Sequence, residues 1–206
     1  MKKYLFIILS LIANLTYAQE TEQKILYDNG RIKEIGNLSG DKRTGDWKFY
    51  YETGELKNIG KYESGEAVNI WKSYHQNGQL KSIGEFKNRN LNGDWKWYYE
   101  NGQLEIECKY ENGIRTGEWK DYYQNGQLKS IQTIENQLRI GERKVYYENG
   151  KLKSYEIYEK GAPNGEWKTY FQNGQLQAIG KYTNGKQQGE WKVYDETGKL
   201  LQTRNF

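Results

Sequence analysis

The sequence predicts an all-β fold of tandem antiparallel β-hairpins that form one elongated, twisted sheet. Three observations predict it. A glycine recurs every 24 residues without insertion, a tryptophan keeps the same interval, and the segments between them are rich in aromatic and β-branched residues. The glycines are Gly30, Gly54, Gly78, Gly102, Gly126, Gly150, Gly174 and Gly198. The tryptophans are Trp47, Trp71, Trp95, Trp119, Trp167 and Trp191, and Arg143 occupies the one position of that series where tryptophan is missing.

Residues 1–18 have the composition of a secretory signal peptide. Two lysines precede a mostly apolar run at 4–13, and Thr16 and Ala18 are small residues at the two positions that a signal peptidase reads. The apolar run is shorter than the roughly 20 residues that a transmembrane helix needs. We therefore predict export to the periplasm or the extracellular space, with a mature chain that starts at Gln19.

The composition of the chain excludes several classes of protein. Without the two lysines of the leader, the 31 basic side chains fall to 29, against 27 acidic ones. A nucleic-acid-binding protein usually has a strongly basic face, so we expect no nucleic acid as a partner. Cys108 is the only cysteine, which rules out an internal disulfide and a thiolate zinc cluster. The buriable surface comes from 19 Tyr and 7 Trp, because one aromatic side chain can bury about 150–250 Å².

The repeats divide the chain into four parts. Residues 1–18 are the leader, and residues 19–29 are a polar lead-in with a starting half-repeat. Seven full repeats occupy residues 30–197, and residues 198–206 are a terminal half-repeat. Half-repeats at both ends fit the need of repeat arrays for capping units.

Each repeat contains two extended segments, such as 79–86 and 94–99, which we predict to be the two strands of one hairpin. The turn between repeats is usually Asn-Gly, and we expect it to be tight because Asn-Gly tolerates positive φ. The turn within a repeat, such as 111–117, is expected to be looser. Pro163 lies in one of these looser turns, where it would break no ladder bond.

The second segment of each repeat has two different faces, because side chains alternate along a strand. One face carries residues such as Trp119, Asp121 and Tyr123 and is mainly aromatic or apolar at its ends. The other face repeats an acid-Lys-Tyr pattern, as at Glu118 and Lys120. We interpret it as a solvated surface because its opposite charges neutralise each other, with a binding surface as the alternative. Its lysines are Lys48, Lys72, Lys96, Lys120, Lys144, Lys168 and Lys192.

The first segment of each repeat does not alternate simply. Its apolar residues are spaced by three, as in Leu56, Ile59 and Tyr62, and a glycine such as Gly60 follows the middle one. A glycine there indicates a β-bulge or a close approach of the backbone to another group. A bulged strand and a strand with two half-buried faces are both compatible with this spacing.

The pattern Tyr-x-x-Gly-x-Leu-Lys followed by Gly-Glu-Trp-Lys-x-Tyr-Tyr resembles the bacterial variant of the MORN repeat, which occurs in YwqK-type antitoxins of toxin–antitoxin systems. The resemblance covers residues 24–206 in register. It implies successive antiparallel hairpins in an elongated sheet, in agreement with the pattern above. It also implies interaction with proteins or lipids, as an accessory module.

The residues give little support for catalysis. His75, the only histidine, occupies a position that holds tyrosine in other repeats, such as Tyr51 and Tyr99, so we expect it to pack as another ring. No glycine-rich phosphate loop and no Gly-x-Ser-x-Gly motif is present in the sequence. We therefore predict no catalytic residue, no cofactor, no metal site and no enzymatic activity. Cys108 is expected to be a small, half-buried residue, with a reactive thiol as the alternative in an oxidising compartment.

The candidate binding surface is the tryptophan series together with one extra aromatic residue. Its members are Trp47, Trp71, Trp95, Trp97, Trp119, Trp167 and Trp191. The strict interval favours packing as their main role. If they are exposed, a row of indoles about 10 Å apart would suit sugar rings or a partner protein. Irregular positions in the region 95–145, above all Arg143, indicate either sequence drift or contact with a partner.

These observations predict a secreted or periplasmic, non-enzymatic MORN-type repeat protein that acts as a protein-interaction module, with an antitoxin-like role as one form of it. The alternative is a carbohydrate-binding or cell-envelope-binding repeat protein that uses its aromatic column. The expected partner is therefore a protein, or else an envelope glycan. Lipid binding is less favoured, because the charges are nearly balanced and no amphipathic helix is evident.

Overall fold

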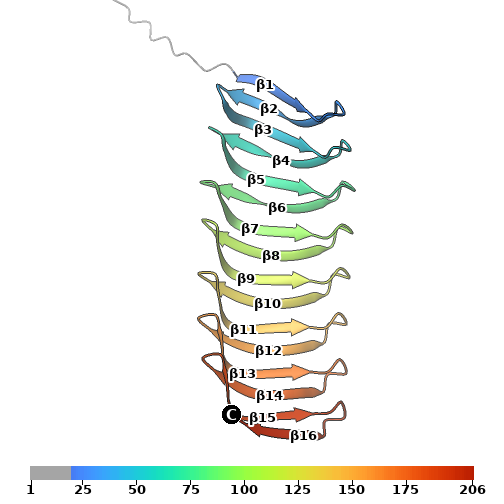
Figure 1. Ribbon diagram of the computed structural model, residues 1–206, viewed down its shortest axis with the longest axis vertical. Helices are drawn as coiled ribbons and strands as arrows, with labels where there is room; N and C mark the ends of the chain where they lie inside the picture. Colours follow the sequence, from blue (N-terminus) through green and yellow to red (C-terminus); the bar gives the residue numbers. More distant parts are fainter. Residues whose placement is uncertain (1–19) are drawn as a thin grey trace, which may run out of the picture.

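Residues 20–206 form one open sheet of 16 antiparallel strands in the computed structural model of the chain (Figure 1). Each strand pairs with the strands before and after it in the sequence, so the hairpins follow one another along a single axis. The all-β prediction is confirmed. The structure describes residues 20–206, and the predicted leader at 1–18 lies outside them. This described part contains no helix with the length and apolar character needed to cross a membrane.

Even-numbered strands are the first segments of the repeats and odd-numbered strands are the second. The odd strands are β1 (Glu20–Leu26), β3 (Lys42–Tyr50), β5 (Glu66–Tyr74), β7 (Asn90–Tyr98), β9 (Ile114–Tyr122), β11 (Leu138–Tyr146), β13 (Ala162–Tyr170) and β15 (Lys186–Tyr194). The even strands are β2 (Ile32–Ser39), β4 (Leu56–Glu63), β6 (Leu80–Lys87), β8 (Leu104–Glu111), β10 (Leu128–Glu135), β12 (Leu152–Glu159), β14 (Leu176–Thr183) and β16 (Leu200–Asn205).

The turns within the repeats are tight, contrary to the expectation from the sequence. Asn112 and Gly113 have φ values of 49° and 83° and link β8 directly to β9. Positive φ at both central residues is typical of a two-residue type I′ hairpin turn. Residues 114–117, which were expected to loop out, are the first residues of β9, and Pro163 likewise lies in β13 and not in a turn.

The Asn-Gly turns between repeats are the wider ones, and their asparagines have a different role. After β9, only Gly126 of the turn has positive φ (84°). The Oδ1 of Asn125 accepts a hydrogen bond from the backbone N–H of Gln127 (2.9 Å), and its Nδ2 donates to the carbonyl of Glu148 in the next repeat (3.1 Å). Asparagine is therefore useful here for its side-chain hydrogen bonds and not for positive φ, which is why the turn prediction was wrong.

A β-bulge explains why apolar residues of the first strand are spaced by three. The neighbours Phe49 and Tyr50 of β3 pair with Asn58 and Leu56 of β4, so one extra residue lies between the two pairs. The extra residue reverses the alternation, which puts Leu56 and Ile59 on the same face of the sheet.

A second bulge in each regular repeat places a tryptophan ring directly against the backbone of a glycine. The pairing of β6 with β7 shifts at Gly84, and the Trp95 indole lies against that glycine so closely that a Cβ there would overlap the ring. The bulge and the close approach suggested by the glycine are thus both present. Gly36, Gly60 and Gly180 hold Trp47, Trp71 and Trp191 in the same way.

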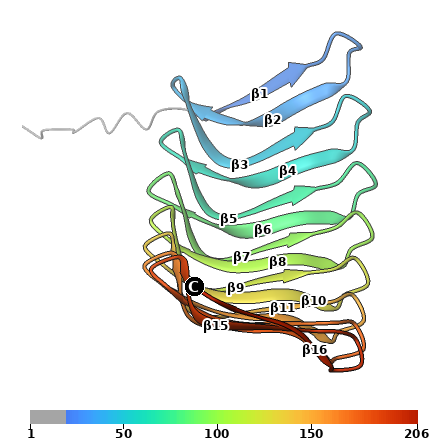
Figure 2. The ribbon, with the colours of Figure 1, turned by 60° about the horizontal axis from the view of Figure 1, so that its bottom comes forward.

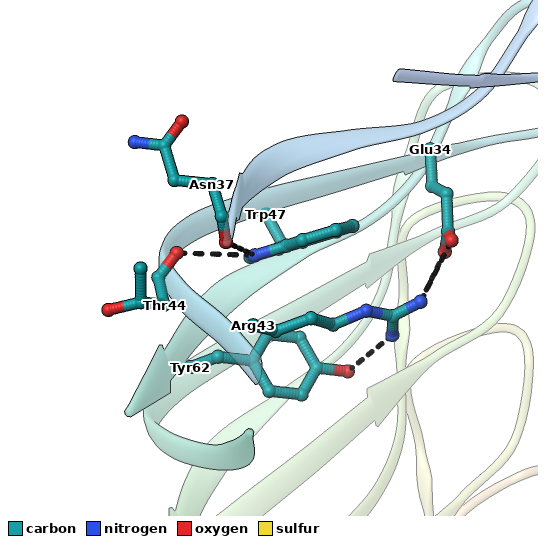
Figure 3. Close-up of polar contacts among 6 residues, drawn as sticks. All are labelled: Glu34, Asn37, Arg43, Thr44, Trp47 and Tyr62. Carbon is teal, nitrogen blue, oxygen red and sulfur yellow. Dashed lines mark hydrogen bonds and ion pairs between the residues drawn. The ribbon is translucent and has the colours of Figure 1, made fainter. Parts of the chain in front are cut away.

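The indole N–H completes this contact at Trp47, Trp95 and Trp191 by donating to main-chain carbonyls at the bulge, whereas the Nε1 of Trp71 has no acceptor within residues 20–206. Figure 3 shows the Nε1 of Trp47 between the carbonyls of Asn37 (3.1 Å) and Thr44 (3.2 Å). The Nε1 of Trp95 donates to the carbonyl of Glu85 (3.1 Å). The tryptophan therefore fills the space above the glycine and satisfies backbone groups that the bulge removes from the regular ladder.

We call the face that carries the tryptophan series the front face and the face that carries the lysine series the back face. The hairpins bend along their length, so the sheet is curved across its width (Figure 2). On the front face, aromatic rings of successive strands pack mostly edge to face, with centroids 5.1–6.5 Å apart. The row runs from Trp47 to Trp119 and resumes from Tyr158 to Phe206.

Tyrosine hydroxyls tie each repeat to the next. The Tyr99 hydroxyl donates to the carbonyl of Tyr122 (2.8 Å), 23 residues later. His75 takes the place of a tyrosine, and its Nε2 lies 2.7 Å from the carbonyl of Tyr98, which agrees with the expectation that it packs as another ring. The tyrosines that make the same bond are Tyr27, Tyr51, Tyr123 and Tyr147.

The substitution Gly84→Ala should lower the free energy of unfolding by about 1–3 kcal/mol, because the added methyl overpacks the space that the Trp95 indole fills. Urea unfolding followed by circular dichroism measures the loss as a lower midpoint. The matched control is the same substitution in a Trp95→Ala background, where the ring is absent and the methyl should be tolerated. An equal loss in both backgrounds would show that the glycine is needed for some other reason.

Candidate functional site

The front face is the candidate binding surface, and its tryptophans are packed and not openly displayed. The exposed fraction is 0% for Trp47, 5% for Trp95 and 8% for Trp191. Rings from the even strands stand against the indoles, as where Phe86 meets Trp95 edge-on at a centroid distance of 5.3 Å. The remaining members of the predicted surface are half-buried: Trp71, Trp97, Trp119 and Trp167.

The front face is apolar without being covered by a second layer within residues 20–206. All strands of this part belong to one sheet, and no helix lies beside it. A sheet normally buries its apolar face against another element. Here the rings between residues 47 and 119, apart from the buried Trp47 and Trp95, remain partly accessible to solvent. The half-buried rings besides tryptophan are Phe49, Tyr62, Phe86 and Tyr110.

The back face neutralises its own charges. The Nζ atoms of Lys120, Lys168 and Lys192 lie 2.5, 2.6 and 2.7 Å from the carboxylate two residues earlier on the same strand. Hydrogen bonds to these carboxylates raise the pKa of the three lysines. This agrees with the interpretation of a solvated, neutral face. Ile70 replaces the acid in β5 and is 53% exposed.

Polar side chains replace the aromatic row at the centre of the front face. Arg143 stands at the tryptophan position, and its Nη1 donates to the Oε2 of Glu156 (2.8 Å). The Glu156 carboxylate also accepts hydrogen bonds from the Ser154 Oγ (2.7 Å) and the Tyr158 hydroxyl (3.0 Å). Glu156 is only 5% exposed, so its carboxylate is buried, and three donors compensate for the loss of water.

Sequence reasoning noted Arg143 but missed its partner. A signal for the partner was present, because the glycine that regular repeats place against tryptophan is absent at three successive positions. The residues at these positions are Cys108, Gln132 and Glu156. The missing tryptophan and the missing glycines are therefore parts of one local change.

A second polar group lies beside Cys108. The Asp121 carboxylate accepts hydrogen bonds from the Trp119 Nε1 (3.1 Å) and the Ser130 Oγ (2.6 Å). Cys108 itself is 3% exposed, more deeply buried than the sequence suggested, and burial raises the pKa of its thiol to about 12. A thiol that keeps its proton is a poor nucleophile, so the reactive alternative is not supported.

The repeats match a known family over most of the described chain. The sequence pattern of the MORN repeat variant matches residues 43–64, 68–88, 91–112, 115–136, 139–160, 163–184 and 187–206. The chain belongs to the MORN repeat variant family. No curated protein matches it. The MORN array is a binding type of repeat architecture and not a known class of enzyme, and MORN repeats are generally associated with protein or membrane-lipid interactions.

The Cys108 thiol should react with a thiol reagent at about pH 8 at least tenfold more slowly than glutathione, because its pKa is raised from 9.0 to about 12. Unfolding in urea should restore the ordinary rate. The same shift predicts that the stabilisation from the neutral thiol is complete below pH 9.0 and is lost as the pH rises toward 12, since the unfolded chain loses the proton first. A native reaction rate equal to that of glutathione would contradict the burial.

Proposed function

We propose that this MORN repeat protein is an exported, non-enzymatic protein-interaction module that binds its partner on the front face. The observation that carries the proposal is a row of aromatic rings between residues 47 and 119, most of them partly accessible, on a sheet face without a second layer in the described residues. Aromatic side chains are enriched in protein interfaces and dominate their energetics. Export rests on the composition of residues 1–18.

The back face is a poorer candidate for the same role. Four of its lysines are engaged by acids of their own strands, as at Lys168 and Glu166. A partner that covered such pairs would have to desolvate both charges and would gain little in return. The front face offers apolar surface at no such cost.

Envelope glycans are a weaker candidate ligand for the front face. A sugar ring stacks on the open face of an indole. Tyr62 stands edge-on against Trp71 at 5.1 Å, and Phe86 does the same to Trp95, so these indoles already have ring neighbours. A protein partner can instead use the whole apolar surface without needing an open stacking platform.

The proposal predicts capture of one protein by the mature chain from Gln19 when the native envelope fraction is passed over it. The variant that combines Phe49→Ser with Trp97→Ser should capture at least tenfold less, because it removes two front-face rings. Serine is tolerated there, since Ser73 occupies the same position in another repeat. Mass spectrometry identifies the bound material.

The matched control for this capture experiment is Ile83→Glu on the back face, where Glu107 is the natural equivalent. It should capture as much protein as the unaltered chain. Undiminished capture by the front-face variant would refute the assignment of the face. Glycan recovered in place of protein would refute the proposal in favour of the envelope-binding alternative.

A more specific form of the proposal is that the partner is a protein toxin, which the resemblance to antitoxin repeats supports. With a leader at 1–18, the two proteins would meet outside the cytoplasm. Deleting the gene for this chain should then be lethal while a neighbouring toxin gene is intact and harmless once that gene is also removed. Normal growth of the single deletion would refute the antitoxin role and leave the interaction module untouched.

A further inference from the structure

Arg43 on the front face is stabilised both by aromatic rings and by a neighbouring carboxylate (Figure 3). Its guanidinium lies over the Trp47 ring at 4.4 Å and over the Tyr62 ring at 5.3 Å. Its Nη2 lies 2.8 Å from both carboxylate oxygens of Glu34, which comes from the neighbouring strand β2. The charge is thus stacked on aromatic rings and paired with an acid.

Arg115 and Arg139 occupy the position of Arg43 in two central repeats, at multiples of the 24-residue interval. Both are stacked in a similar way: the guanidinium of Arg115 lies 5.5 Å from the centre of the Trp119 ring, and that of Arg139 lies 5.7 Å from the centre of the Tyr158 ring. The aromatic half of the Arg43 arrangement is therefore repeated at the centre of the front face.

The carboxylate half is missing there. The position of Glu34 is held by Ile106 in the repeat of Arg115 and by Ser130 in the repeat of Arg139. Neither arginine forms an ion pair within residues 20–206, although Arg139 donates a hydrogen bond from Nε to the Oε1 of Gln132 (2.8 Å).

Two acids of this region are already engaged. Asp121 accepts hydrogen bonds from Trp119 and Ser130, and Glu156 is the ion-pair partner of Arg143. Two guanidinium groups of this region thus face solvent with their Nη atoms available to an external acid. Both arginines are exposed.

The two arginines line a common hollow of about 210 Å³ whose other walls include Trp119, Ile134 and Leu138. Ile134 is 6% exposed and Leu138 is 47% exposed, and both contribute apolar surface to the hollow. The side chains of Gln132 and Gln137 line it as well, so most of its surface is polar. Its volume is below the roughly 300–1,000 Å³ of a pocket for a drug-sized ligand, but it can admit one side chain.

We propose that this hollow, the arginine pocket (Arg115, Trp119, Ile134, Leu138 and Arg139), receives an acidic side chain of the protein partner, with an apolar residue of the partner against its rim. The inference rests on the proposed function and names the chemistry of the contact. The partner's carboxylate supplies to Arg115 and Arg139 what Glu34 supplies to Arg43. Charge-assisted hydrogen bonds from arginine to carboxylate are strong and directional.

The test measures the fluorescence anisotropy of a labelled hexapeptide of alternating glutamate and phenylalanine, titrated with the mature chain at low ionic strength. The glutamine counterpart of the peptide reports binding without charge. The double variant Arg115→Gln with Arg139→Gln should bind the acidic peptide at least about tenfold more weakly, since a hydrogen bond to a charged group contributes about 1.5–3 kcal/mol. Glutamine fits this position, as Gln187 shows.

The matched control replaces Lys42 and Lys186, both exposed, with glutamine and so changes the net charge by the same amount. It should keep the affinity of the unaltered chain, and both variants should keep its circular dichroism spectrum. Equal binding of the acidic and glutamine peptides, or an equal loss in the control, would overturn the arginine pocket. So would binding to phosphatidylglycerol vesicles in preference to the acidic peptide.

The same double variant separates this proposal from the proposed function in the envelope capture experiment. Loss of the captured protein with Arg115→Gln and Arg139→Gln, but not with the lysine control, supports the arginine pocket. Full capture by the arginine variant overturns the pocket and leaves the interaction module in place. If the unaltered chain captures no protein, the proposed function fails, while the peptide titration still decides whether the pocket binds carboxylates.

Discussion

The contact between a tryptophan indole and a bare glycine is the constraint on which every regular repeat depends. It needs a strand bulge to turn the ring onto the backbone and a glycine to make room, and at Trp95 a carbonyl also accepts the indole N–H. These requirements lie on two adjacent strands, so they can be met only if the spacing between Gly84 and Trp95 is fixed. An insertion between them would separate the ring from its glycine, so this contact fixes the part of the 24-residue interval that runs from the glycine to the tryptophan.

The other contacts between repeats reinforce the same interval. The Tyr99 hydroxyl and the Asn125 amide each reach a carbonyl 23 residues later in the chain. Such bonds link each hairpin to the next, as expected for an array in which stability is the sum of repeat and interface contributions. Because the sheet has no second layer in the described residues, its rings cannot be buried against another element. They are instead buried partly against one another, since successive strands bring them into contact.

The fold could be predicted from the sequence because it depends on this interval and on strand alternation, which are both visible in the residues. The geometry of the turns could not, because Asn-Gly serves two purposes: Asn112 supplies positive φ, whereas Asn125 supplies hydrogen bonds. The arginine pocket was also beyond the sequence alone. The structure shows that Arg43 pairs with Glu34, nine residues earlier in the chain. Only with that pair known does it matter that Ser130 replaces this acid in the repeat of Arg139.

The irregular centre of the front face is better explained as a coordinated change than as drift. Arginine at position 143 with glycine at position 156 would leave a half-buried guanidinium without an acid, and removing one partner of a buried ion pair costs about 3–5 kcal/mol. Instead Glu156 meets Arg143, and Ser154 and Tyr158 complete its hydrogen bonds. Gln132 stands at the glycine position that would face an indole at 143, so its larger side chain meets no ring there. Cys108 and Glu156 stand at the corresponding positions before Trp119 and Trp167, where the tryptophan is kept without its glycine. The sheet and the 24-residue interval are thereby kept, while hydrogen bonds and an ion pair around Arg143 and Glu156 replace the packing of aromatic rings. In a repeat protein, a segment whose residues differ from those of the other repeats can bind a partner specifically, because the regular repeats all present the same surface.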